Sequence, residues 1–269
     1  MSRITQKGQG APINLFSTTT DLSLSTMVGS RFDLADGREV VLVQNAGTAL
    51  GSGVGVQGPA AQANAVGLAP ATSGTTGYTA AVPIAAAIGG KQIQIATGAT
   101  AVLVNRFQNG YLNVVEGTGL GQTLKISSNT AASTTSAMII NLEDAFTVAT
   151  STDSRFTLTI CPHGSRYGTD FTTDGVIISP ATTLTGTIVG VSLYPIPAST
   201  ASVAQYGFIQ TKGPVAVLGS STVAIGLDVG LPSGTAGAVL AYAVATGPRV
   251  GTTMVATASA KYNLVNIDL

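Results

Sequence analysis

Three glycines alternate in the stretch VVEGTGLGQTLKI, which runs from Val114 to Ile126 and is a candidate phosphate-binding loop. A dinucleotide site needs Gly-x-Gly-x-x-Gly between a strand and a helix, because the pyrophosphate binds at the helix N-terminus. Gly117 and Gly119 fit this spacing, but the third position is Gln122 and the residues after it are typical of a strand. The Gly-Lys-Ser/Thr ending of a P-loop is also missing. We therefore interpret the stretch as a glycine-rich β-hairpin or bulge, and we expect no cofactor.

The tripeptide Cys161-Pro162-His163 joins the only cysteine of the chain to its only histidine. A thiol nucleophile with an imidazole base is conceivable, but residues i and i+2 separated by a proline do not readily place the two side chains together. As zinc ligands they supply two groups where a tetrahedral site needs three or four. The simpler interpretation is a thiol at the end of a strand beside a histidine in a loop, and no disulfide can form within the chain.

Two local carboxylate pairs, Glu143 with Asp144 and Asp170 with Asp174, are the candidates for glycosidase chemistry. Acidic residues at the ends of loops ordinarily form turns, and the sequence does not show either pair at a catalytic separation. The sequence therefore assigns no catalytic, cofactor-binding or metal-binding residue, and we expect a protein that is not an enzyme.

The elements that would position these residues are predicted to be β-strands. Strict alternation places Ile93 and Ile95 on one face of the segment 92–96 and its glutamines on the other. Three other segments have a strand-like pattern: Arg38–Gln44, Phe156–Ile160 and Val265–Leu269. We expect an all-β, antiparallel, sandwich or barrel-like fold with few short helical turns.

The predicted domain organisation has three parts. Residues 1–30 are polar with irregularly spaced apolar residues, which indicates an extended arm that contacts a neighbouring subunit. Residues 31–195 form the main β-rich domain, and residues 196–269 form a C-terminal β lobe that is either separate or packed as one unit with the main domain. The boundary follows from Tyr194–Thr200, where two prolines deny hydrogen-bond donors to a central strand and favour a linker.

The composition narrows the choice of partners. Charged residues make up only 9% of the chain, and the 12 basic and 12 acidic residues give a formal net charge of zero. Because no basic patch can neutralise a run of phosphates, nucleic acid is not an expected partner. So few surface charges limit the solubility of a monomer, and we therefore expect subunits or a larger assembly to cover much of the surface.

The sequence also contains no predicted membrane segment. Residues 1–16 have no continuous apolar segment after their basic residues, so they do not resemble a secretory signal. The most apolar region, 234–246, is too short and too interrupted by glycine to span a bilayer. We expect synthesis in the cytoplasm without membrane insertion.

Several stretches, in order along residues 28–269, resemble the virion structural proteins of tailed bacteriophages, in particular head decoration or capsid cement proteins. The first runs from Val28 to Arg38 and is followed by Gly47–Gly53; the second is the glycine stretch in its setting from Asn109 to Thr130. The third is Gln205–Leu218, followed by a small-residue turn at Thr235–Ala238 and a final strand from Lys261. The long N-terminal region departs from the compact members of this family.

The resemblance implies a β-rich protein on the outer surface of an icosahedral phage head, made in the host cytoplasm. It implies binding to the major capsid protein and self-association, with a homotrimer favoured, and it implies stabilisation of capsid contacts without catalysis. The alternative is a receptor-binding or glycan-binding protein associated with a fibre. The absence of tryptophan disfavours this alternative, since carbohydrate sites usually stack sugars on aromatic faces.

Overall fold

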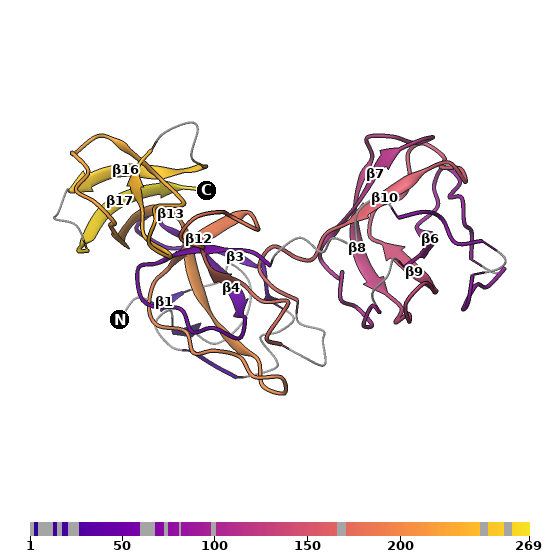
Figure 1. Ribbon diagram of the computed structural model, residues 1–269, viewed down its shortest axis with the longest axis horizontal. Coiled ribbons are helices and arrows are strands. Elements are labelled where there is room, and N and C mark those ends of the chain that lie inside the picture. The colour runs from indigo at the N-terminus through magenta and orange to yellow at the C-terminus, as the bar shows by residue number, and fades with distance from the viewer. Residues whose placement is uncertain are drawn as a thin grey trace. The chain divides into compact units, whose positions relative to one another are not determined.

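The computed structural model describes residues 3–4, 13–14, 18–20, 27–59, 68–72, 75–80, 82–97, 101–165, 171–242, 247–255 and 260–269. These residues form strands joined by turns, and they contain no α-helix (Figure 1). Every pairing between two strands is antiparallel. The predicted all-β, antiparallel fold class is therefore confirmed.

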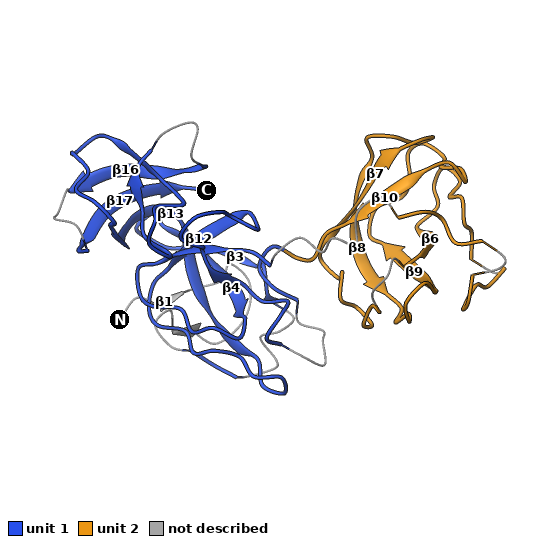
Figure 2. Ribbon diagram, in the orientation of Figure 1, with its two compact units in different colours: residues 1–60, 162–166, 170–269 blue, residues 61–161, 167–169 orange. Residues whose placement is uncertain are grey.

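The chain divides into two compact units (Figure 2). Unit 1 comprises residues 1–60, 162–166 and 170–269, and unit 2 comprises residues 61–161 and 167–169. The expected division into 31–195 and 196–269 is not the one observed, because unit 2 is inserted into unit 1 as a nearly continuous segment. A strand pattern gives no sign of such an insertion, since both units are built from the same residue types.

Unit 2 contains one sheet with the strand order β10-β7-β8-β9-β6. Its strands are β6 (Gln92–Ala96), β7 (Tyr111–Glu116), β8 (Thr123–Asn129), β9 (Ala137–Leu142) and β10 (Arg155–Leu158). The alternation predicted for 92–96 is present, and Ile93 and Ile95 are fully buried in the core of this unit. Gln94 is also fully buried, and its side-chain amide is satisfied there because Oε1 accepts from the N–H of Thr79 and Nε2 donates to the C=O of Thr79.

Unit 1 is organised around β13, a strand of 14 residues that runs from Gln205 to Leu218. Its first half pairs with β4 (Glu39–Asn45), and its second half pairs with β17 (Tyr262–Asp268). Gly213 stands between the two halves with a φ of +91°, a value that disfavours any residue with a Cβ. The other strands of the unit are β1 (Arg3–Ile4), β2 (Ile13–Asn14), β3 (Arg31–Asp33), β5 (Gly55–Gln57), β11 (Ile177–Ile178), β12 (Ile188–Ser192), β14 (Asp228–Gly230), β15 (Leu240–Ala241) and β16 (Arg249–Val255).

Two hydrophobic clusters form the core of unit 1, and β13 contributes to both. Phe208 packs in the first cluster with its ring edge against Phe32, at 5.7 Å between centroids. Val215 and Val217 pack in the second cluster with residues of β14, β16 and β17. The C-terminal residues thus have a core of their own, but they share β13 with the rest of the unit. This shared strand is the physical reason why residue 195 is not a domain boundary.

The segment Tyr194–Thr200 is packed rather than a linker. Leu50 and Ile196 exchange both backbone hydrogen bonds, and Ile196 is fully buried. The side-chain amide of Asn45 donates to the carbonyl of Pro197 at 2.7 Å. Pro195 and Pro197 therefore flank a buried bridge residue within the core, which the sequence pattern alone did not reveal.

The predicted arm, residues 1–30, lies largely outside the described residues. In the part that is described, β1 pairs with β2, and Thr19 forms an antiparallel bridge with Tyr206 of β13. At least this one point of the N-terminal region is therefore attached to unit 1 of its own chain. Contact with a neighbouring subunit stays a prediction.

Candidate functional site

The glycine stretch forms the hairpin between β7 and β8 of unit 2. Gly117, Gly119 and Gly121 all adopt positive φ values, between +77° and +89°. The next element is the strand β8, which begins at Thr123, so the helix that a phosphate site requires is not there. The sequence interpretation as a glycine-rich hairpin is confirmed.

Two of these glycines also allow the backbone of the segment 149–153 to lie close to the hairpin. A Cβ on Gly117 would lie 2.6 Å from the carbonyl oxygen of Asp153, and one on Gly119 would lie 3.1 Å from the carbonyl oxygen of Ala149. Gly121 has no heavy atom within 4 Å of its Cβ position. The hairpin therefore packs against the segment 149–153 through its first two glycines, while the third is required only by its backbone conformation.

Gln122, the residue that breaks the nucleotide pattern, joins the hairpin to a second loop. Its Nε2 donates to the carbonyl oxygens of Gly119 at 3.0 Å and Val148 at 2.9 Å. Its Oε1 accepts from the backbone N–H groups of Thr147 and Val148 and from the Thr147 hydroxyl. One side chain thus satisfies five hydrogen bonds and holds the two loops in a single arrangement.

A third loop is held at the same end of unit 2. Gly89 donates its N–H to the carbonyl of Phe146, and Phe146 donates its N–H to the carbonyl of Gly90. The three loops, 86–90, 117–122 and 146–150, contain no charged residue. Each loop exposes one large apolar side chain, and we call this set the loop-end patch: Ile88 (71% exposed), Leu120 (66%) and Val148 (50%).

Unit 1 exposes a second apolar set beside β16. The N–H of Gly226 donates to the carbonyl of Thr253, and the N–H of Thr253 donates to the carbonyl of Leu227, so the segment 223–227 lies along β16. Neither this segment nor residues 250–255 contain a charge. We call the exposed side chains here the β16 patch: Ile225, Leu227, Met254 and Val255.

Cys161 is buried and belongs to unit 2, whereas His163, two residues further along the chain, belongs to unit 1. Burial, with a smaller contribution from the positive charge of Arg31, lowers the pKa of His163 to about 4. Its backbone carbonyl accepts a hydrogen bond from the N–H of Gln44 in β4. The histidine is thus a neutral, half-buried part of unit 1 at pH 7.

The carboxylates have structural partners. Glu143 forms an ion pair with Lys125 at 3.0 Å, and Asp144 accepts a hydrogen bond from the N–H of Lys125 at 3.5 Å. Asp174 is buried, while Asp170 lies outside the described residues. Within the described ranges, no group of three or more His, Cys, Asp or Glu side chains could hold a metal ion.

The functional candidates that the structure adds are therefore surfaces, which the sequence interpretation missed. The signal that could have revealed the loop-end patch is Leu120, a large apolar residue placed between two glycines at a hairpin tip. Ile88 and Val148 give no comparable signal, because only the hydrogen bonds between loops bring them to the same end of the unit.

Comparisons with known proteins give no further guide, since no family model, no curated protein and no solved structure matches the chain. As for membranes, the part of the chain that the structure describes contains no helix with the length and apolarity needed to cross a bilayer.

Proposed function

We propose that this protein is a structural virion protein that binds the outside of a phage capsid and stabilises contacts between major capsid subunits, without catalysis. The observation that carries the proposal is that two separate compact units each expose an uncharged apolar patch. A protein that bridges neighbouring subunits needs at least two contact surfaces, and these patches supply one on each unit.

The apolar exposure of the patches and the fixed loops of unit 2 support binding to another protein. Burial of apolar surface contributes about 25 cal/mol per Å², so covering side chains as exposed as Ile88 and Leu120 would stabilise a complex by roughly 1 kcal/mol or more each. The loops that carry them contain no charged side chain of their own, and the one carboxylate bonded to them is that of Asp153, which accepts from the N–H of Thr118. Gln122 holds two of these loops in place before binding, which lowers the entropy cost of association.

The partners in this proposal are the major capsid protein and further copies of the same chain, with a homotrimer favoured. The resemblance of the ordered stretches along residues 28–269 to decoration proteins supports this assignment. The low content of charged residues supports it too, because an assembly covers surface that would otherwise limit solubility.

The experiment that tests the proposal adds the purified protein to phage heads from which it has been stripped. We expect saturable, stoichiometric binding and greater resistance of the heads to heat. The double variant Leu120→Ser, Val148→Ser should bind at least about tenfold more weakly, because it removes two apolar side chains from the loop-end patch.

The matched control is Val203→Ser, since Val203 is 42% exposed and belongs to neither patch. This variant should bind as the unchanged protein does. Failure of the unchanged protein both to bind and to protect the heads would refute the capsid proposal. Equal binding by the double variant and the control would show that the loop-end patch does not contribute to capsid binding.

A further inference from the structure

Two rows of side chains lie across the outer face of the unit 2 sheet, on β8, on β7 and on residues 157–159 at the end of β10. The alternation of buried and exposed residues along these strands places both rows outside the core. Directly opposite Cβ atoms on antiparallel strands lie about 5 Å apart, so each row spans about 10 Å. We call the six residues the outer rows: Lys125, Tyr111 and Thr159 in the first row, and Thr123, Asn113 and Thr157 in the second.

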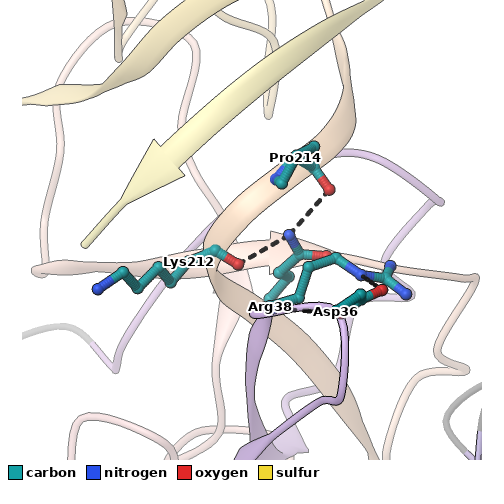
Figure 3. A network of polar contacts seen from close by, with 5 residues as sticks. Asp36, Arg38, Lys212 and Pro214 are labelled. Carbon is teal, nitrogen blue, oxygen red and sulfur yellow. Dashed lines mark hydrogen bonds and ion pairs between the residues drawn. The ribbon is translucent and has the colours of Figure 1, made fainter.

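Asn113 lies at the centre of the second row, on a strand that has neighbours on both sides. Asparagine is depleted in strands, because its amide competes for backbone hydrogen bonds. Where amides occur in other strands they bond to their own chain: Nε2 of Gln210 in β13 donates to the carbonyl oxygens of Lys212 and Pro214 (Figure 3). Among the described residues, none bonds the side-chain amide of Asn113. This amide therefore has no structural role that would explain an asparagine inside a strand.

The neighbours of Asn113 supply further groups for a ligand. The hydroxyls of Thr123 and Thr157, directly opposite it on either side, also bond no residue in the part of the chain that the structure describes. Tyr111, two residues before Asn113 on the same face, is 42% exposed, and within the described ranges of unit 2 it is the only exposed aromatic residue. The outer rows thus combine one aromatic ring with three neutral hydrogen-bonding groups.

The charges at this face decide which ligand it suits. The Nζ of Lys125 is paired with the carboxylate of Glu143 at 3.0 Å, so the outer rows hold no unpaired charge. A phosphate or an acidic sugar requires an unpaired cation, and an apolar protein surface requires more than one apolar side chain. A neutral saccharide meets neither obstacle, because its C–H face stacks on an aromatic ring and its hydroxyls both donate to and accept from amide and hydroxyl groups.

We propose that the outer rows bind a neutral saccharide. One sugar ring stacks on Tyr111, and the sugar hydroxyls bond to Asn113, Thr123 and Thr157. A single tyrosine in place of the larger tryptophan ring supplies few contacts, so we expect a dissociation constant on the order of 1 mM. The inference goes beyond the proposed function, because it concerns the sheet of unit 2 rather than its loops and requires no capsid.

The test is a titration of the full chain with neutral oligosaccharides, monitored by the backbone amide signals in NMR spectra. The probes are lactose, maltotriose, cellotriose, chitotriose and mannotriose, and trigalacturonate serves as the charged probe. We expect saturable shifts at the amides of β7, β8 and β10 with at least one neutral probe, and binding of trigalacturonate at least tenfold weaker. No saturable shift with any neutral probe at about 20 mM, or equal affinity for trigalacturonate, would overturn the proposal.

Two variants assign the binding to the outer rows. Tyr111→Ser removes the ring, and Asn113→Val removes the amide while favouring the strand, so a loss of binding in the second variant does not come from unfolding. Both should bind at least fivefold more weakly, whereas Tyr111→Phe, which keeps the ring, should bind as the unchanged protein does. The matched control is Tyr262→Ser, at a tyrosine of unit 1 that is 49% exposed.

The control variant should leave the saccharide-dependent shifts of unit 2 unchanged. Unweakened binding by both Tyr111→Ser and Asn113→Val would contradict the assignment to the outer rows. All these measurements use the purified protein without phage heads, so either proposal can fail while the other stands.

Discussion

At the residue scale, the glycines of the β7–β8 hairpin are required for different reasons, and alanine substitutions distinguish these reasons. Gly117 combines a φ of +77° with a Cβ position 2.6 Å from the carbonyl of Asp153, whereas Gly121 has a φ of +89° and open space. Gly117→Ala should therefore destabilise unit 2 by roughly 2–4 kcal/mol, from backbone strain and a steric clash. Gly121→Ala should cost only about 1 kcal/mol, from strain alone. Urea denaturation followed by circular dichroism measures both, and equal losses would contradict the packing of Gly117 on Asp153.

His163 gives unit 1 a pH dependence. Because its pKa in the folded protein is about 4, against 6.5 in an unfolded chain, the unfolded chain takes up the proton first as the pH falls. The contribution of neutral His163 to the free energy of unfolding is complete above about pH 6.5 and is lost as the pH falls toward about 4. Between pH 7 and pH 5 we expect a loss of about 2 kcal/mol in the free energy of unfolding.

The control for this prediction is His163→Gln, which removes the titrating group but keeps a polar side chain of similar size. Its free energy of unfolding should change by about 2 kcal/mol less between pH 7 and pH 5 than that of the unchanged protein. Parallel pH profiles for the two proteins would show that His163 is not buried as described.

At the element scale, the arrangement of the unit 2 loops depends on Gln122. Gln122→Met keeps the length of the side chain but removes five hydrogen bonds to the Gly119 and 147–148 backbone and the Thr147 hydroxyl. We expect a loss of roughly 2–4 kcal/mol in stability and faster hydrogen exchange at the amides of residues 147 and 148. Thr123→Ala, an exposed neighbour, should change neither. Unchanged exchange in Gln122→Met would show that the loops are held by other contacts.

Strands with strict alternation could be predicted from the sequence, and those that depend on long-range pairing could not. The segment 92–96 matches β6 because alternation reveals a strand and its core face, although it did not reveal that Gln94 on the other face is also buried. By contrast, the sequence did not reveal that β13 belongs to two cores, since each half alone resembles an ordinary strand. Likewise, Gln122 was recognised only as a departure from a motif, because four of its five hydrogen bonds go to residues 147 and 148, which lie 25–26 residues away in the chain.

At the scale of the whole molecule, the two units differ in how the chain builds them. Unit 2 is almost entirely the continuous segment 61–161 and has its own hydrophobic core, whereas unit 1 is assembled from segments on both sides of it. We therefore expect a fragment of residues 61–161 to fold alone. Its backbone amide spectrum should overlay the corresponding signals of the full chain. A spectrum typical of an unfolded chain would show that unit 2 depends on unit 1.

We propose that this chain acts as a structural protein on the outer surface of a phage head. The most direct measurement is an image reconstruction of intact particles, compared with particles stripped of the protein. We expect ordered density on the outer surface that bridges neighbouring major capsid subunits, is missing from stripped heads and returns when the purified protein is added. Density confined to a tail or fibre, or no difference between the two kinds of particle, would contradict the claim.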